Sequence, residues 1–124
     1  MKYLLDSNII IALVLGIGER LRDRAAICDA DDMVTSSIAF AEVAYGSFKD
    51  RPPAFDQLQA FVEEVPVLAF DYKAALTYAS LPFRRASYDR LIAAHALSHD
   101  LVLVTDNTAD FRDLSDLRLE NWLQ

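Results

Sequence analysis

Carboxylates that follow strand-like runs are the side chains in this sequence best suited to chemistry. Asp6 comes directly after the apolar run Lys2–Leu5, and it is the only charged residue between Lys2 and Glu19. A carboxylate at the end of a buried strand is a good ligand for Mg²⁺ or Mn²⁺, because both cations prefer hard oxygen atoms. The alternative is that Asp6 caps the helix that follows it, as aspartate commonly does.

Glu42 is the carboxylate that structure alone explains least well. It is the only charged side chain between residues 35 and 48, and three or four positions away on a helix it has Ile38, Ala39 and Tyr45. An ionised carboxylate among apolar groups costs free energy unless a cation compensates for it. The pattern favours a metal ligand over a narrow polar stripe on the helix.

Two further carboxylates belong to the same set. Asp89 opens a helical stretch, and Asp106 follows the run Leu101–Thr105, with Asn107 and Asp110 close behind. Each has an ordinary alternative as a first-turn or turn residue. In a parallel sheet, however, ligands bind beyond the carboxyl ends of the strands, where these oxygens would converge. A divalent cation held there would activate water for attack on a phosphodiester.

The elements that must position these side chains alternate along the chain. We expect strands at Lys2–Leu5, Met33–Thr35, Val65–Ala69, Leu101–Thr105 and Arg118–Asn121. We expect helices at Ile9–Leu15, Glu19–Ala30, from Ser36 or Ser37 to about Phe48, Pro53–Glu64, Tyr72–Ser80 and Asp89–His99. Strands that alternate with helices predict an α/β fold with a central parallel sheet covered by helices on both faces. The length of 124 residues suits a single domain, residues 1–124.

The amino-acid composition limits the kinds of protein and the cellular location that we expect. With 53% hydrophobic residues the chain can form a core, and its single cysteine, Cys28, excludes an internal disulfide and favours a reduced, cytoplasmic location. The net charge of −7 argues against nucleic-acid binding through a basic surface, unless bound cations supply positive charge locally. The apolar stretch Ile9–Ile17 is shorter than the roughly 20 residues that cross a bilayer, so we expect no membrane segment.

Four segments, in order, resemble the motifs of PIN domains. They are Tyr3–Ile10, Ser37–Gly46, Tyr88–Ala96 and Leu103–Phe111. The ending Leu117–Trp122 is similar to the tail of VapC-type toxins of type II toxin–antitoxin systems. The resemblance implies a five-stranded parallel sheet, a homodimer, an RNA-cleaving endonuclease and a small cognate antitoxin that blocks the site. The same resemblance implies that Asp6, Glu42 and Asp89 are metal-binding and catalytic carboxylates.

The fourth motif departs from the family pattern. The position two places after Thr105, commonly acidic or an amide, is Asn107, while the carboxylate stands at Asp106. Asp110 matches an acidic position just before Phe111. The fourth metal ligand is therefore open: Asp106, with Asp110 and Asn107 as alternatives.

The stretch before the third motif also looks short. The helix-turn expected before Asp89 is compressed into Leu81–Ser87, which contains Arg84 and Arg85. These two arginines, and Arg112 after the fourth motif, are candidate contacts for RNA phosphates. The alternative is that all three are ordinary surface arginines.

Other interpretations are weaker. His95 and His99 have zinc-binding spacing, but the metalloprotease motif needs a glutamate where Ala96 stands. A phospho-acceptor domain would need a lysine after the strand at Leu101–Thr105. For Tyr45, packing in the core or a dimer is favoured over base stacking.

We therefore expect an Mg²⁺-dependent (or Mn²⁺-dependent) endoribonuclease toxin, and the alternative is a catalytically inactive PIN-like RNA- or protein-binding module.

Overall fold

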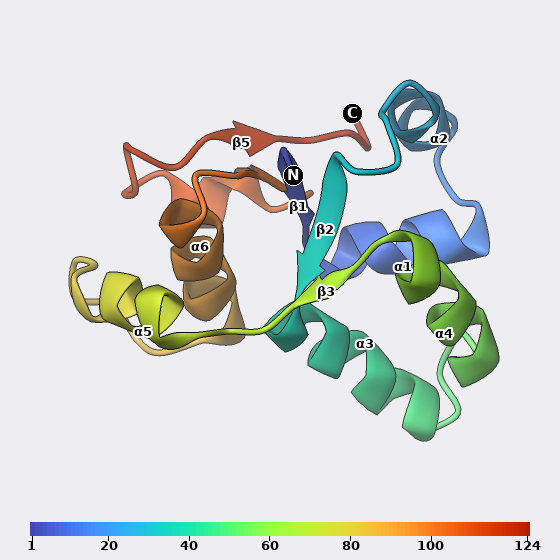
Figure 1. Cartoon of the computed structure of the whole chain (residues 1–124), viewed down its shortest axis with the longest axis horizontal. Coiled ribbons are helices and arrows are strands. Elements are labelled where there is room, and N and C mark those ends of the chain that lie inside the picture. Colours follow the sequence, from blue (N-terminus) through green and yellow to red (C-terminus); the bar gives the residue numbers. More distant parts are fainter.

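A five-stranded, all-parallel sheet in the order β3-β2-β1-β4-β5 runs through the middle of the protein (Figure 1). The computed structural model describes all 124 residues. The strands are β1 (Tyr3–Leu5), β2 (Met33–Ser36), β3 (Val67–Leu68), β4 (Val102–Val104) and β5 (Leu119–Glu120). The predicted parallel α/β fold is confirmed, although the strand expected at Val65–Ala69 has only two paired residues.

Six α-helices and one 3₁₀ helix flank this sheet. They are α1 (Ser7–Leu15), α2 (Glu19–Ala26), α3 (Ser37–Phe48), α4 (Phe55–Glu64), α5 (Tyr72–Ala79), α6 (Tyr88–Ser98) and η1 (Thr108–Phe111). Helix α1 begins earlier than expected because Asp6 caps it, and α4 begins later because Ala54 is its N-cap residue. None of the helices is both long and apolar enough to cross a membrane.

Strand β1 lies at the centre of the sheet and pairs with both β2 and β4. Leu5, the last residue of β1, pairs with Thr35 on β2 and with Val104 on β4. The residues that follow these strands therefore emerge at one edge. Because the pairing is parallel, that edge carries the carboxyl ends of all three strands.

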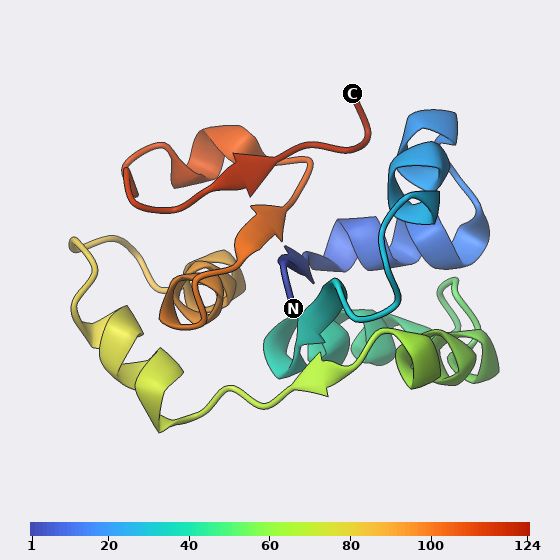
Figure 2. The same cartoon turned by 45° about the horizontal axis from the view of Figure 1, so that its top comes forward.

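Helix α6 is the most deeply buried helix, with seven of its eleven residues in the interior. Its small side chains Ala93, Ala94 and Ala96 are fully buried, so the helix backbone can lie close to its neighbours. Arg90 on the same helix is also buried, and its Nη1 atom lies 3.1 Å from both carboxylate oxygens of Asp113. This ion pair connects α6 to the segment that follows η1 and orients the first turn of the helix. Figure 2 shows α6 between α5 and the strand β4.

Residues 81–87, between α5 and α6, form no helix or strand. The carbonyl of Pro82 accepts a hydrogen bond from Nη2 of Arg90 at 3.3 Å, and Arg84 donates to Asp113 at 3.0 Å. The segment is therefore held beside the N-terminus of α6 by arginine side chains. The helix-turn expected within Leu81–Ser87 does not form.

We expect Leu103→Ala to lower the free energy of unfolding by about 2 to 5 kcal/mol, because Leu103 is fully buried in β4 and its removal leaves a cavity. Leu76→Ala is the matched control: Leu76 is 54% exposed, and its loss should change stability by no more than about 0.5 kcal/mol. Urea denaturation measures both values. Similar losses for the two variants would contradict the assigned core.

Candidate acidic site at the carboxyl edge of the sheet

Asp6 is a buried carboxylate held by two hydrogen bonds. It follows β1 and is 4% exposed. Its Oδ1 atom accepts from the backbone N–H of Ser7 at 2.8 Å, and its Oδ2 atom accepts from the hydroxyl of Thr105 at 2.8 Å. Burial raises the pKa of Asp6, and the nearby charges of Asp89 and Asp106 raise it further. Asp6 thus caps α1, which was the alternative interpretation of this residue, and it also interacts with the charges of the other acidic groups.

Glu42 lies on α3 with one carboxylate oxygen hidden from solvent. Its Oε1 atom is buried and has no hydrogen-bond partner. Burial raises the pKa of Glu42 to about 7, with further contributions from the negative charges of Asp6 and Asp89. A buried carboxylate oxygen without a donor is costly, so the group is suited to accept a proton or a cation.

Asp89 stands in the first turn of α6, partly buried. Burial raises its pKa, followed by the charges of Asp110 and Asp106. The side chains of Asp6, Glu42 and Asp89 come from three elements far apart in the sequence, yet their charges act on one another. The structure therefore brings the three predicted carboxylates into one neighbourhood.

The three candidates for a fourth ligand differ in their surroundings. Asp106 is exposed, and its Oδ1 atom accepts from the side-chain amide of Asn8 at 3.2 Å. The amide of Asn107 donates to Asp110 at 2.6 Å, so these two side chains engage each other. Only Asp106 raises the pKa of both Asp6 and Asp89, whereas Asp110 affects Asp89 alone.

This donor set fits a hard divalent cation. It offers carboxylate oxygens that repel one another, one of them without a partner, and a cation would relieve both costs. No three His, Cys, Asp or Glu side chains in this structure lie close enough together to hold a metal ion by themselves. Mg²⁺, however, is commonly held by one or two carboxylates together with water and substrate phosphate.

Two of the predicted arginines border Asp89. A pocket of about 300 Å³ is lined by Arg84, Arg85, Ala86, Ser87, Asp89, Arg90 and Asp110. Arg84 and Arg90 share Asp113 as their ionic partner, while Arg85 takes part in no ion pair. Arg112 does not line this pocket; it is an exposed residue just after η1.

His95 is a packed residue that completes α6. It is fully buried, and its Nδ1 atom lies 2.8 Å from the hydroxyl oxygen of Ser36. Burial lowers the pKa of His95, as does the charge of His99. The contact between His95 and Ser36 connects α6 to the end of β2.

Sequence reasoning missed the residues that orient the carboxylates. Thr105 donates to Asp6 and also accepts the backbone N–H of Asn107 at 3.1 Å. Asn8 donates to Asp106. The available signal was a buried hydroxyl at the end of an otherwise apolar strand, but its partner is 99 residues away and becomes apparent only in the fold.

Comparisons with known proteins identify relatives over the full length. Residues 3–117 match the family model of the PIN domain. The chain is 30% identical to the tRNA(fMet)-specific endonuclease VapC of Salmonella typhimurium over 131 residues, which covers 98% of both chains. It is 31% identical to ribonuclease VapC2 of Haemophilus influenzae over 136 residues, 99% of both. The solved VapBC2 of Rickettsia felis, bound to a DNA fragment from its promoter, superposes with a TM-score of 0.85 at 27% identity, covering 98% of this chain and 99% of that one.

The raised pKa of Glu42 predicts a pH-dependent stability. A carboxyl group whose pKa is higher in the folded protein than its unfolded value of 4.5 favours folding when protonated. Its contribution is therefore present below that value and is lost as the pH rises through about 7. In chelator, the melting temperature should fall between about pH 5 and pH 8.

Glu42→Gln should flatten this pH dependence, and Glu63→Gln, at an exposed position on α4, should leave it unchanged. Added Mg²⁺ should raise the melting temperature of the wild type most at the alkaline end. Thermal denaturation followed by circular dichroism measures these effects. A Glu42→Gln profile that parallels the wild type would show that Glu42 does not carry the effect.

Proposed function

The chain belongs to the PIN-domain family, and from this membership we propose that it is an endoribonuclease that cleaves RNA with Mg²⁺ held by Asp6, Glu42 and Asp89. The observation that carries the proposal is the neighbourhood of these three carboxylates, in which burial raises each pKa and the charges of nearby carboxylates raise it further. Curated relatives that match the whole chain are named as endonuclease and ribonuclease. Both observations support hydrolysis of phosphodiester bonds.

Asp106 is our choice for the fourth carboxylate, because its charge acts on Asp6 and Asp89 together. Asp110 and Asn107 are the alternatives, but they are engaged with each other. When bound, Mg²⁺ (or Mn²⁺, which has similar ligand preferences) lowers the pKa of a coordinated water and neutralises charge on the phosphodiester.

The protein's own contribution is to position these groups. Thr105 holds the Oδ2 atom of Asp6, and the N–H of Ser7 holds the Oδ1 atom, so the carboxylate keeps one orientation. The unpartnered Oε1 atom of Glu42 is free to bind a cation or a proton. Arg85, which has no ionic partner, and Arg84 lie beside Asp89, where they can contact phosphates of the RNA.

The biological role we propose is that of a toxin. The relative from Rickettsia felis was solved as VapBC2, which supports an antitoxin partner. We propose that this small cognate antitoxin covers the acidic site. We further propose a homodimer that acts in the cytoplasm. The alternative, a catalytically inactive RNA- or protein-binding module, predicts no RNA cleavage and no Mg²⁺ binding by calorimetry.

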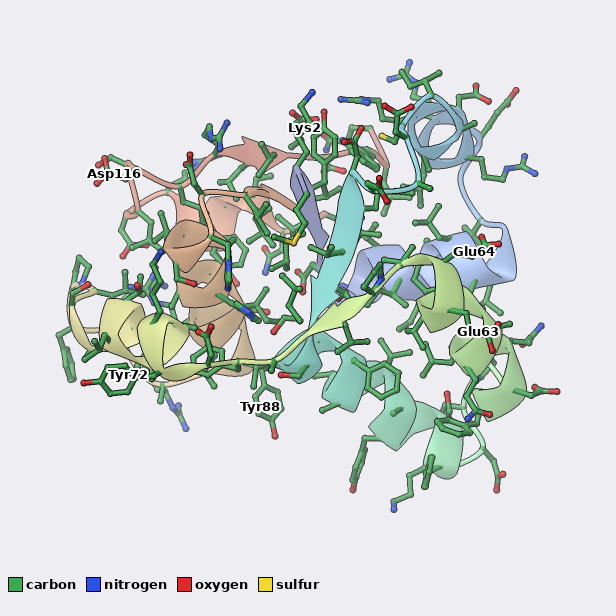
Figure 3. The ribbon with its side chains drawn as sticks, in the orientation of Figure 1. Lys2, Glu63, Glu64, Tyr72, Tyr88 and Asp116 are labelled. Atoms are coloured by element: carbon green, nitrogen blue, oxygen red, sulfur yellow. The ribbon has the colours of Figure 1, made fainter.

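Asp89→Asn should reduce RNA cleavage by more than about 100-fold. Loss of a residue that only hydrogen-bonds to a metal ligand typically costs about 10- to 100-fold, and loss of the ligand itself should cost more. The variant should keep the circular dichroism spectrum and melting profile of a folded protein. Asp116→Asn is the matched control, since Asp116 is exposed and lies at the far edge of the molecule (Figure 3). Cleavage of total RNA with Mg²⁺ and with chelator is the measurement, and wild-type cleavage by Asp89→Asn would refute the assignment.

Thr105→Val should weaken Mg²⁺ binding by about 10- to 100-fold, since it removes the hydroxyl that holds Asp6 while preserving the shape of the side chain. Thr105→Ser keeps the hydroxyl and should restore most of the affinity. Isothermal calorimetry with Mg²⁺ compares the three proteins. Equal affinities for the valine and serine variants would mean that Thr105 has only a packing role.

A further inference from the structure

A second pocket, with aromatic walls, borders the acidic site on the side of Glu42. Its volume is about 490 Å³, and its lining residues are Ile38, Ala41, Glu42, Tyr45, Arg51 and Tyr88. Glu42 belongs to this pocket and Asp89 to the arginine-lined pocket. Tyr88 of this pocket is followed directly in the chain by Asp89 of the arginine-lined pocket, so the two pockets adjoin at the first turn of α6.

The spacing of the residues on α3 explains how one wall forms. Ile38, Ala41, Glu42 and Tyr45 follow one another at intervals of three, one and three positions, which places them on one face of the helix. Tyr88, the first residue of α6 and the neighbour of Asp89 in the chain, also lines the pocket. Figure 3 shows Tyr88 projecting away from the ribbon near the start of α3.

Both tyrosines are unusually exposed for aromatic residues beside a buried site. Tyr45 is 61% exposed and Tyr88 is 62% exposed. The expectation that Tyr45 packs in the core is wrong, because Tyr45 lies on the outer face of α3 and this helix buries Ala39 and Val43. Packing of Tyr45 in a dimer stays a prediction. Tyr45 and Tyr88 are left with ring surface available to a ligand.

Positive charge gathers at the same pocket in an otherwise acidic protein. The Nζ atom of Lys49 lies 4.6 Å from the ring centroid of Tyr45. Arg51 lines the pocket and passes over Gly46, at which an added Cβ would lie 3.7 Å from its Nε atom. Neither Lys49 nor Arg51 takes part in any of the ion pairs of the structure. Aromatic rings beside unpaired cations are the usual features of a site for single-stranded nucleic acid.

We propose that this pocket binds an unpaired RNA base, which stacks on Tyr45 or Tyr88 while Arg51 and Lys49 contact its phosphates. The inference rests on the proposed ribonuclease function. A base seated here places its adjoining phosphodiester beside Glu42 and Asp89, and the chain then continues toward Arg85. The strand must be unpaired, because a base within a duplex cannot offer its face to a side chain.

The test measures RNA binding separately from cleavage. The probe is a ten-nucleotide oligoadenylate with one central 2-aminopurine, which suffices because stacking on aromatic rings tolerates any base. Binding is followed by anisotropy and by 2-aminopurine quenching, with Ca²⁺ in place of Mg²⁺ and a gel to verify that the RNA is intact. The variants are Tyr45→Ala, Tyr88→Ala and the double variant, each compared with its phenylalanine counterpart.

We expect the double alanine variant to bind the probe about 5- to 150-fold more weakly and to lose the quenching, the range that stacking of one base spans. The phenylalanine variants should stay within about twofold of the wild type, because they keep the ring. Tyr72→Ala is the matched control, since Tyr72 is 78% exposed on α5 and does not line the pocket.

Three results would overturn the proposal, and none depends on cleavage. One is wild-type affinity and quenching in the double alanine variant. Another is unchanged RNA binding with a shift in oligomeric state by sedimentation, which would make the pocket a contact between copies of the chain. The third is unchanged RNA binding with loss of affinity for the antitoxin, which would make it a protein-binding groove. Ring-dependent quenching in a wild type that cleaves no RNA would instead refute the ribonuclease and leave the base pocket standing.

Discussion

The parallel pairing of β1 with β2 and β4 is the constraint on which the site depends. Leu5 lies level with Thr35 and Val104, so the chain leaves all three strands at the same height. Asp6 is thereby placed beside Thr105, and α3 starts directly after β2. A slip of one residue in this register would exchange the two buried faces on which Leu4 and Leu5 pack, because successive side chains of a strand point to opposite faces.

The carboxylates at the carboxyl edge of the sheet are electrostatically unfavourable when they are ionised. Asp6 is buried and Glu42 has a hidden oxygen without a donor, although the charges of both groups oppose each other and that of Asp89. A protein gains no stability from such an arrangement by itself, since burial and like charge both disfavour ionised carboxylates. A bound cation would offset both costs, and carboxylates whose pKa values are raised in this way cluster at functional sites.

The surroundings of the site divide into two chemically distinct halves. On one side Asp113 holds Arg84 and Arg90, and on the other Tyr45, Tyr88 and Arg51 line the pocket of Glu42. The net negative charge of the chain therefore does not describe the charge of the surface around the carboxylates. Basic side chains are gathered at the site itself, where an anionic polymer would have to lie.

Much of the fold was predictable because its signals are local. Buried strands appear as apolar runs, helices appear through their periodicity, and their alternation implies a parallel sheet. The weakest prediction was β3, which pairs through only two residues and so has little local signal. The starts of α1 and α4 were also misplaced: the Asp6 side chain caps α1, and at the start of α4 the Gln57 side chain accepts a hydrogen bond from the backbone N–H of Ala54.

The sequence by itself determined which carboxylates stand after strands, and it singled out Glu42 through its lack of charged neighbours. Only the tertiary structure decided which groups interact: Thr105 with Asp6, Asn8 with Asp106, and Arg90 with Asp113. It also decided that Tyr45 faces outward beside Tyr88, a residue 43 positions later in the chain. The physical reason is that hydrogen bonds, ion pairs and pockets depend on distances in space, whereas periodicity and capping act between near neighbours along the chain.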